Sequence, residues 1–92
     1  MLSAMTDDVR SDGDIDPVRA QIGDNVRAEL VRRRRSQDWL AEVLGLSQPQ
    51  ISKRLIGKIG FEARELVLTA KALDCSTSAF FHEVVLPEDV AV

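Results

Sequence analysis

The sequence predicts an all-α fold: one small domain of five short helices, two of which form a helix-turn-helix. Three observations predict it. Apolar residues recur at helical spacing along most of the chain, and no segment shows the alternation typical of a strand. Residues that cap helices stand before the apolar runs, and glycines follow several of them. The chain has 92 residues, which is enough for one hydrophobic core and too few for two.

The first helix is predicted to begin at Asp16-Pro17, because an acid suits the N-cap and proline suits the first helical position. From there every fourth residue is apolar, which gives one stripe of Val18, Ile22, Val26 and Leu30. The helix is expected to end in the run 32–35, four consecutive arginines, because positive charge is favourable at a helix C-terminus.

Two short helices are predicted next, with a tight connection between them. Ser36 can cap the second helix through its hydroxyl, and Gly45 supplies the positive φ that ends it. Ser47 can cap the third helix, which carries Ile51 and Leu55 on its apolar edge. Two short helices joined by a turn of three or four residues are typical of a helix-turn-helix.

Two further helices complete the predicted fold. A fourth helix follows the loop between Gly57 and Gly60, and its apolar face consists of Leu66, Ala70 and Leu73. A fifth, short helix is expected after Ser76 or Thr77 and before Pro87. Its apolar residues are Phe80, Phe81 and Val84.

Composition along the chain predicts three segments. Residues 1–15 are acidic and carry few apolar side chains, so they are expected to form a disordered acidic tail. Residues 16–84 hold the helices and form the helix-turn-helix domain. Residues 85–92 form a C-terminal tail and a candidate dimer contact.

The net charge of −3 hides a basic middle segment. Five acids and one arginine in residues 1–16 give −4, nine bases and four acids in residues 17–60 give +5, and two bases and six acids in residues 61–92 give −4. A basic segment between acidic ends predicts a localised anionic partner. The alternative is that these charges form an ordinary solvated surface.

The composition also excludes several classes of function. The single cysteine, Cys75, excludes an intramolecular disulfide and a cysteine-based zinc site, and the single histidine, His82, excludes a histidine-rich metal site. No nucleophile–base pair or phosphate-binding loop is present, so we expect a non-enzymatic protein that needs no cofactor. No apolar run approaches the ~20 residues that cross a bilayer, and the N-terminus lacks a secretory pattern, so we expect a cytoplasmic protein without a membrane partner.

The segment 36–52, with the sequence SQDWLAEVLGLSQPQIS, resembles the helix-turn-helix of the Cro/C1-type (XRE-like) DNA-binding domains. The strings NVRAEL at 25–30 and SQPQISKRL at 47–55 are similar to strings in actinobacterial and actinobacteriophage members. The resemblance extends from Ile22 to Phe81, about two thirds of the chain, and implies the five-helix lambda-repressor-like fold.

The chain departs from the family pattern at three positions. Arg35 stands where most members have an apolar residue, and Leu30 and Leu55 stand where many members pair an arginine with a glutamate. Replacing a buried ion pair by packed hydrophobic side chains is often neutral or stabilising. We therefore expect Leu30 and Leu55 to pack together, with the fold unchanged.

The resemblance places the third helix in the major groove, with its N-terminal end at the base edges. Gln48 and Gln50 are then expected to contact bases, because a glutamine amide matches the donor and acceptor of adenine. Lys53 can donate to guanine, and Pro49 can touch a thymine methyl group. In the alternative interpretation both glutamines are polar residues of an ordinary solvated surface.

Other residues are expected to contact phosphates. The resemblance assigns this role to Gln37 at the start of the second helix, where the unpaired N–H groups also attract an anion. Arg35 lies next to that helix start and Lys58 lies in the loop after the third helix, whereas Ser52 and Arg54 flank the base-contacting face. The complete set of candidate DNA-binding residues is Arg35, Gln37, Ser47, Gln48, Pro49, Gln50, Ser52, Lys53, Arg54 and Lys58.

The leading hypothesis is a sequence-specific regulator of transcription that binds double-stranded DNA, either a phage or bacterial repressor or a Cro-like protein. One helix-turn-helix contacts few base pairs, so a homodimer on a two-fold symmetric operator is expected. The alternative is a protein-interaction module, such as an antitoxin-like partner, which the acidic ends and the apolar C-terminus favour.

The C-terminal region is the predicted dimer contact, because it carries more apolar surface than one short helix needs. Its apolar residues are Phe80, Phe81, Val84, Val85, Leu86, Val90 and Val92. In the alternative, one phenylalanine fills the core and the remainder is a frayed tail. Trp39 also has two interpretations, packing against the first helix or a loop, or contact with DNA or a partner.

Overall fold

The computed structural model describes residues 14–88, so the tail predicted at 1–15 lies almost entirely outside the described residues. Within the described range the chain is all-α, as predicted. It consists of α2 (Pro17–Arg32), α3 (Gln37–Leu44), α4 (Gln48–Ile56), α5 (Ala63–Leu73) and the 3-10 helix η1 (Thr77–Phe81). None of these helices has the length and apolar character that crossing a bilayer requires.

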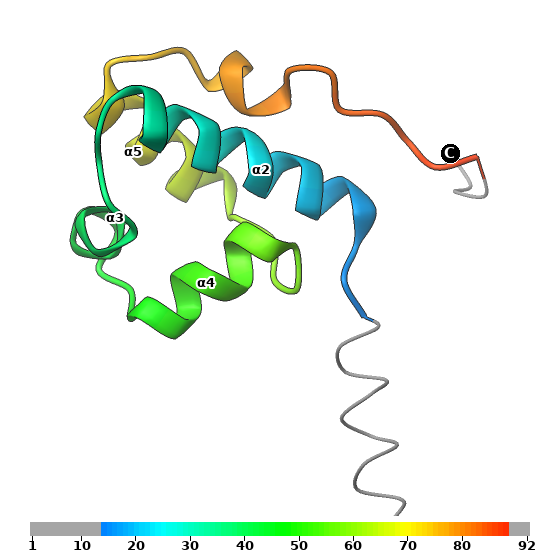
Figure 1. Cartoon of the computed structure of the whole chain (residues 1–92), viewed down its shortest axis with the longest axis horizontal. Coiled ribbons are helices and arrows are strands. Elements are labelled where there is room, and N and C mark those ends of the chain that lie inside the picture. The colour runs from blue at the N-terminus through cyan, green and yellow to red at the C-terminus, as the bar shows by residue number, and fades with distance from the viewer. Residues whose placement is uncertain (1–13, 89–92) are drawn as a thin grey trace, which may run out of the picture.

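In the arrangement of these elements, α2 occupies the centre (Figure 1). The helix α4 lies on one side of α2, and the segment from η1 to residue 88 runs along the opposite side in the reverse direction. The helix α3 is seen end-on at the left of the view, with α5 behind α2. The helix α2 is therefore packed between two different parts of the chain.

Capping residues set the helix boundaries, and the predicted helix starts are confirmed. The side chains of Asp16, Ser36 and Ser47 each accept a hydrogen bond from a backbone N–H in the first turn of the helix that follows. Gly45 has φ 68° and ends α3 in the left-handed region, which favours glycine. The Gln50 side chain also accepts from the Ser47 N–H at 2.9 Å, which completes a capping box.

The core is formed by apolar side chains from all five elements. Its buried members are Val26, Leu30, Leu40, Ile51, Leu55, Leu66, Ala70, Leu73 and Phe80. Leu30 and Leu55, which we expected to pack together, both belong to this cluster and are at most 2% exposed. The core therefore joins α2 to α4 through hydrophobic side chains.

The C-terminal end of α4 lies directly against the backbone of α2. A Cβ atom on Gly23 would lie 2.1 Å from the carbonyl oxygen of Leu55, and one on Gly57 would lie 2.6 Å from the backbone nitrogen of Ala20. The Asp16 N–H also donates to the Gly57 carbonyl oxygen at 3.1 Å. These contacts leave no room for side chains, so they determine where α4 lies relative to α2.

The prediction of a fifth α-helix is wrong. Within the described residues the chain has four α-helices, and the fifth element is the five-residue 3-10 helix Thr77–Phe81, with Val84 beyond its end. The physical reason lies in α2, because the amide of Asn25 donates to the carbonyl oxygens of Phe80 and His82, both at 2.9 Å. An α-helix continuing through this segment would use those carbonyl groups for its own hydrogen bonds.

Residues 82–86, which we call the C-terminal strap, follow η1 along α2 in Figure 1. The Gln21 side chain binds the strap at both backbone groups of Val85, donating to its carbonyl oxygen and accepting from its N–H, each at 2.8 Å. Glu83 has φ 55°, which turns the chain between η1 and this contact. The side chains of Val85 and Leu86 are 67% and 52% exposed. The strap is therefore held to α2 by hydrogen bonds between the Gln21 side chain and the Val85 backbone, while the side chains of Val85 and Leu86 face solvent.

Candidate nucleic-acid interface

The helices α3 and α4 are separated only by residues 45–47, of which Leu46 packs against the core. In Figure 1 the axis of α3 points toward the viewer while α4 lies across the view, so the two helices cross steeply. The short turn and the steep crossing leave one side of α4 at the surface.

The two faces of α4 differ in character. Ile51, Arg54 and Leu55 are buried. The remaining residues of the helix are exposed, namely Gln48, Pro49, Gln50, Ser52, Lys53 and Ile56. The exposed side is polar at the N-terminal end and becomes apolar at Ile56, which is 41% exposed. We call Gln48, Pro49, Ser52 and Lys53 together the α4 surface.

Arg54, which we expected to be able to reach phosphate, lies in the interior and is 8% exposed. Its Nε and Nη2 atoms donate to the two carboxylate oxygens of Glu65 at 2.8 and 3.1 Å, and its Nη1 donates to the carbonyl oxygen of Gln50 at 3.2 Å. Because all three nitrogen atoms of the guanidinium donate hydrogen bonds inside the protein, Arg54 is removed from the candidate DNA contacts. It instead fixes the rotation of α4 about its own axis.

Glu65 receives this contact at the start of α5. Burial raises the pKa of Glu65, but the hydrogen bonds from Arg54 and the Glu62 N–H, with the charges of Arg54 and Arg64, outweigh it and leave that pKa below its ordinary value of 4.5. The carboxylate is therefore charged at neutral pH. The pair is bidentate, the geometry that makes an arginine–carboxylate contact strong and directional.

Ser47 and Gln50 are engaged with each other at the start of α4. The Ser47 hydroxyl accepts from the Gln50 N–H at 3.3 Å, and the amide oxygen of Gln50 accepts from the Ser47 N–H at 2.9 Å. We expected both residues to contact DNA. The structure gives their side chains the role of stabilising the first turn of α4, so Gln50 is a weaker candidate for base contact than Gln48.

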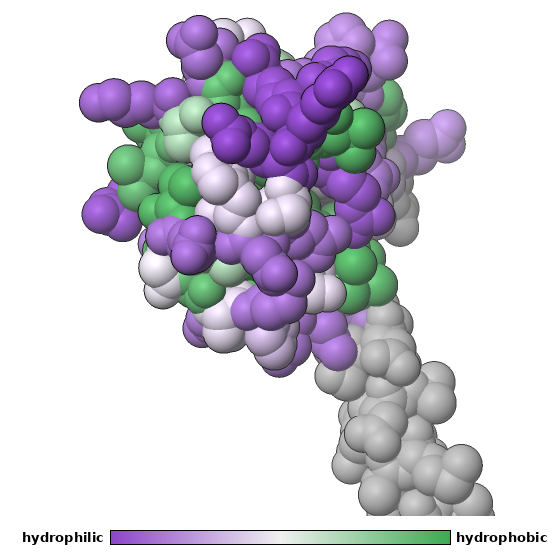
Figure 2. Space-filling model, turned by 60° about the vertical axis from the view of Figure 1, so that its left-hand side comes forward, coloured by the Kyte–Doolittle hydropathy of each residue, from purple (hydrophilic) through white to green (hydrophobic). Residues whose placement is uncertain are grey.

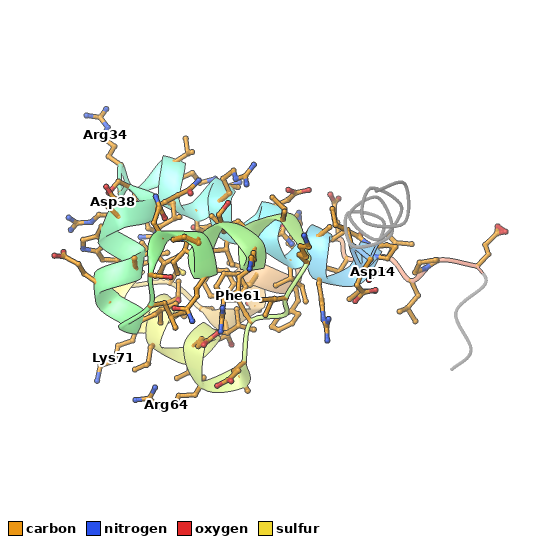
Figure 3. All side chains as sticks on the ribbon, turned by 90° about the horizontal axis from the view of Figure 1, so that it is seen from below. Asp14, Arg34, Asp38, Phe61, Arg64 and Lys71 are labelled. Carbon is orange, nitrogen blue, oxygen red and sulfur yellow. The ribbon has the colours of Figure 1, made fainter. Side chains whose placement is uncertain are left out.

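Gln48 makes a contact that links α4 to α3. Its Nε2 donates to Oδ1 of Asp38 at 3.0 Å, and both side chains are exposed. Asp38 projects from the N-terminal end of α3 (Figure 3). The sequence did not indicate this contact, because the two residues are ten positions apart and on different helices.

The four consecutive arginines at the C-terminal end of α2, residues 32–35, have different surroundings. Arg32 and Arg33 both pair with the buried carboxylate of Glu29, with the Nε of Arg33 at 3.3 Å from it. Arg34 projects away from the body of the protein (Figure 3). Figure 2, which turns the α3 side toward the viewer, shows hydrophilic side chains gathered over the upper part of this face. Half of the arginine run is thus paired within the protein.

The remaining candidate phosphate contacts surround the α3–α4 unit. The guanidinium of Arg35 lies over the ring of Trp39, 5.0 Å from its centroid, in a cation–π contact. Trp39 is partly buried against the core, which favours the packing interpretation of that residue. Gln37 is the first residue of α3 and is half-buried, and Lys58 is half-buried in the loop after α4.

The apolar residues proposed for the dimer contact separate into two groups. Phe80 is fully buried in the core. Phe81 is 48% exposed, and Val85 and Leu86 on the strap are 67% and 52% exposed. Val90 and Val92 lie outside the described residues. The exposed residues Phe81, Val85 and Leu86 belong to η1 and the strap, which lie on the side of α2 opposite α4 (Figure 1).

The α4 surface therefore combines exposed hydrogen-bonding groups with a helix whose position is set by the core and by close backbone contacts with α2. A scan of protein-family models and a search of the curated proteins both found no match for this chain.

Proposed function

We propose that this protein is a sequence-specific regulator of transcription that binds double-stranded DNA, with α3, residues 45–47 and α4 acting as a helix-turn-helix. The observation that carries the proposal is the division of α4 into two faces. Its inner face is fixed by the core and the Arg54–Glu65 pair, and its outer face presents an amide, a hydroxyl and an ammonium group. The major groove of B-DNA admits an α-helix, and these groups match its donors and acceptors.

The length of α4 limits how much DNA one copy can recognise. A helix of nine residues is about 13 Å long, which corresponds to about four base pairs of B-DNA. A site of that length is too short to be specific, so the proposal includes a homodimer on a two-fold symmetric operator. Half-sites one helical turn apart would be separated by about 34 Å.

The exposed apolar side chains offer a surface for that homodimer. The helix η1 and the strap, which carry the exposed Phe81, Val85 and Leu86, lie across α2 from α4, so a second copy bound there would leave the α4 surface open to DNA. The same side chains also favour the second candidate function, a protein-interaction module such as an antitoxin-like partner. The two candidates differ in which surface carries the activity.

Phosphate contacts are assigned to Gln37, Arg35 and Lys58, with Lys53 at the edge of the groove. A charge reversal at an exposed position on the α4 surface tests this arrangement without disturbing the core. Lys53→Glu is expected to weaken binding to every duplex by at least about tenfold at low salt and to reduce the slope of log K against log salt. Lys71→Glu, the same change at an exposed position of α5, is the control and should alter binding less than about twofold.

The measurement is fluorescence anisotropy of labelled duplexes selected from random DNA, titrated with each protein over a range of salt concentrations. Equal losses in the two variants would show that DNA does not bind at the α4 surface. A failure of the native chain to select any duplex would favour the protein-interaction module.

A further inference from the structure

The hydrogen bond from Gln48 to Asp38 connects the first residue of α4 to the first turn of α3. We propose that Asp38 is a specificity-determining residue, which orients the Gln48 amide so that it accepts adenine and rejects guanine. This inference rests on the proposed function, because it concerns base contacts made by the α4 surface. It assigns a role to a residue that need not touch DNA.

The chemistry of the amide explains the selectivity. A glutamine side chain has two N–H donors and one carbonyl acceptor, and one of the donors of Gln48 is directed at the Asp38 carboxylate. The second N–H and the carbonyl oxygen then remain for the groove. Adenine presents an N6 donor beside the N7 acceptor, which this pair matches, whereas guanine presents two acceptors, O6 and N7. An amide held in this orientation would place its oxygen against O6 of guanine.

The charge of Asp38 prevents the opposite orientation. An ionised carboxylate accepts hydrogen bonds and cannot donate one, so a flipped amide would place the Gln48 oxygen against a carboxylate oxygen. An asparagine at this position could donate or accept, and would allow both orientations. In the free protein the contact is exposed and weak, but water is displaced when a helix enters the groove, and electrostatic contacts strengthen in that environment.

The position of Asp38 fits this role in two further respects. Ser36 already caps α3 through its hydroxyl, so the Asp38 carboxylate is available to Gln48. A negative charge in the first turn is also favourable to the helix. Near phosphates, however, the same charge lowers affinity for every duplex. Repulsion of this kind reduces affinity and can increase discrimination between ligands.

The experiment compares Asp38→Asn with Glu42→Gln, which removes the same charge from the next exposed acid on α3. Duplexes recovered by selection are first assayed with Gln48→Ala to find the base pair whose recognition depends on Gln48. The binding constant of each protein is then measured on that duplex and on one with adenine changed to guanine at this pair in both half-sites. Thermal unfolding of each variant confirms that α3 is retained.

The native chain is expected to prefer adenine over guanine by at least about thirtyfold, because two good bidentate contacts, one in each half-site, are replaced. In Asp38→Asn this preference should fall below about threefold while affinity for both duplexes rises, whereas Glu42→Gln should raise affinity for both and keep the preference. If Asp38→Asn keeps the full preference, or if no base pair depends on Gln48, the role of Asp38 is contradicted while DNA binding stands. If the native chain selects no duplex, both this inference and the proposed function fail.

Discussion

The two sides of α2 are held by different kinds of contact. On the α4 side, the backbones of α2 and α4 touch at Gly23 and Gly57, and the side chain of Leu55 is buried beside this contact. On the strap side, the amides of Gln21 and Asn25 bind backbone groups of the chain, and the strap leaves its apolar side chains in solvent. The α4 side thus has one permitted arrangement, suited to presenting a recognition surface. The strap itself is held by a few hydrogen bonds and exposes the apolar side chains of Val85 and Leu86.

The sharpest way to test the α4 side is Gly23→Ala. In an ordinary helix this change is stabilising by up to about 1 kcal/mol. Here the new Cβ would lie 2.1 Å from the Leu55 carbonyl oxygen, a backbone atom that cannot turn away. We expect destabilisation by about 3–5 kcal/mol in urea unfolding. Asp24→Ala, at the neighbouring exposed position, is the control, and an unchanged or increased free energy of unfolding in Gly23→Ala would show that α4 does not lie so close to α2.

Removing the charge of Glu65 tests how α4 is oriented. Glu65→Gln leaves the buried guanidinium of Arg54 without its counter-charge, and we expect a loss of about 2–4 kcal/mol at neutral pH. The pKa of Glu65 is lowered by folding, so its contribution to stability is present above pH 4.5 and is lost as the pH falls through the lower value in the folded state. The variant should therefore lose less stability than the native chain between neutral and strongly acidic pH. Parallel acid-unfolding curves would contradict the assignment.

The strap side should respond more weakly. Asn25→Ala removes two hydrogen bonds to backbone carbonyl groups that solvent can replace in part, so we expect the free energy of unfolding to fall by about 1–2 kcal/mol.

Gln21→Ala removes the two bonds to Val85, which are exposed, and should lower the free energy of unfolding by less than about 1 kcal/mol. Hydrogen exchange of the Val85 amide should accelerate in Gln21→Ala while exchange in α4 stays unchanged. Faster exchange throughout the molecule would mean that the strap is part of the cooperative core.

Features determined by neighbouring residues could be predicted from the sequence. Asp16, Ser36, Gly45 and Ser47 define helix ends through contacts within one turn, so their roles follow from residue type and position. The apolar spacing likewise identified Ile51 and other core residues, because periodicity within a helix shows which side faces inward.

Features that depend on distant residues could not be predicted. The carboxylate that pairs with Arg54 lies eleven positions away on another helix, so the pattern could not distinguish a buried arginine from one at the surface. From the sequence, Gly23 cannot be distinguished from any other glycine within a helix, because its close contact with α4 arises only in the tertiary fold. The prediction of a fifth α-helix was wrong for the same reason, because the amide of Asn25 on α2 binds the carbonyl groups of Phe80 and His82.

We propose above all that DNA binds at the α4 surface. This is tested by the change in backbone amide chemical shifts when the native chain is titrated with a selected half-site duplex, which is expected to bind one copy and to leave the proposed dimer contact empty. We expect the largest changes on residues 48–53 and at the start of α3, with the amide of Val85 on the strap unchanged. Changes concentrated on the strap and η1, with α4 unaffected, would contradict it.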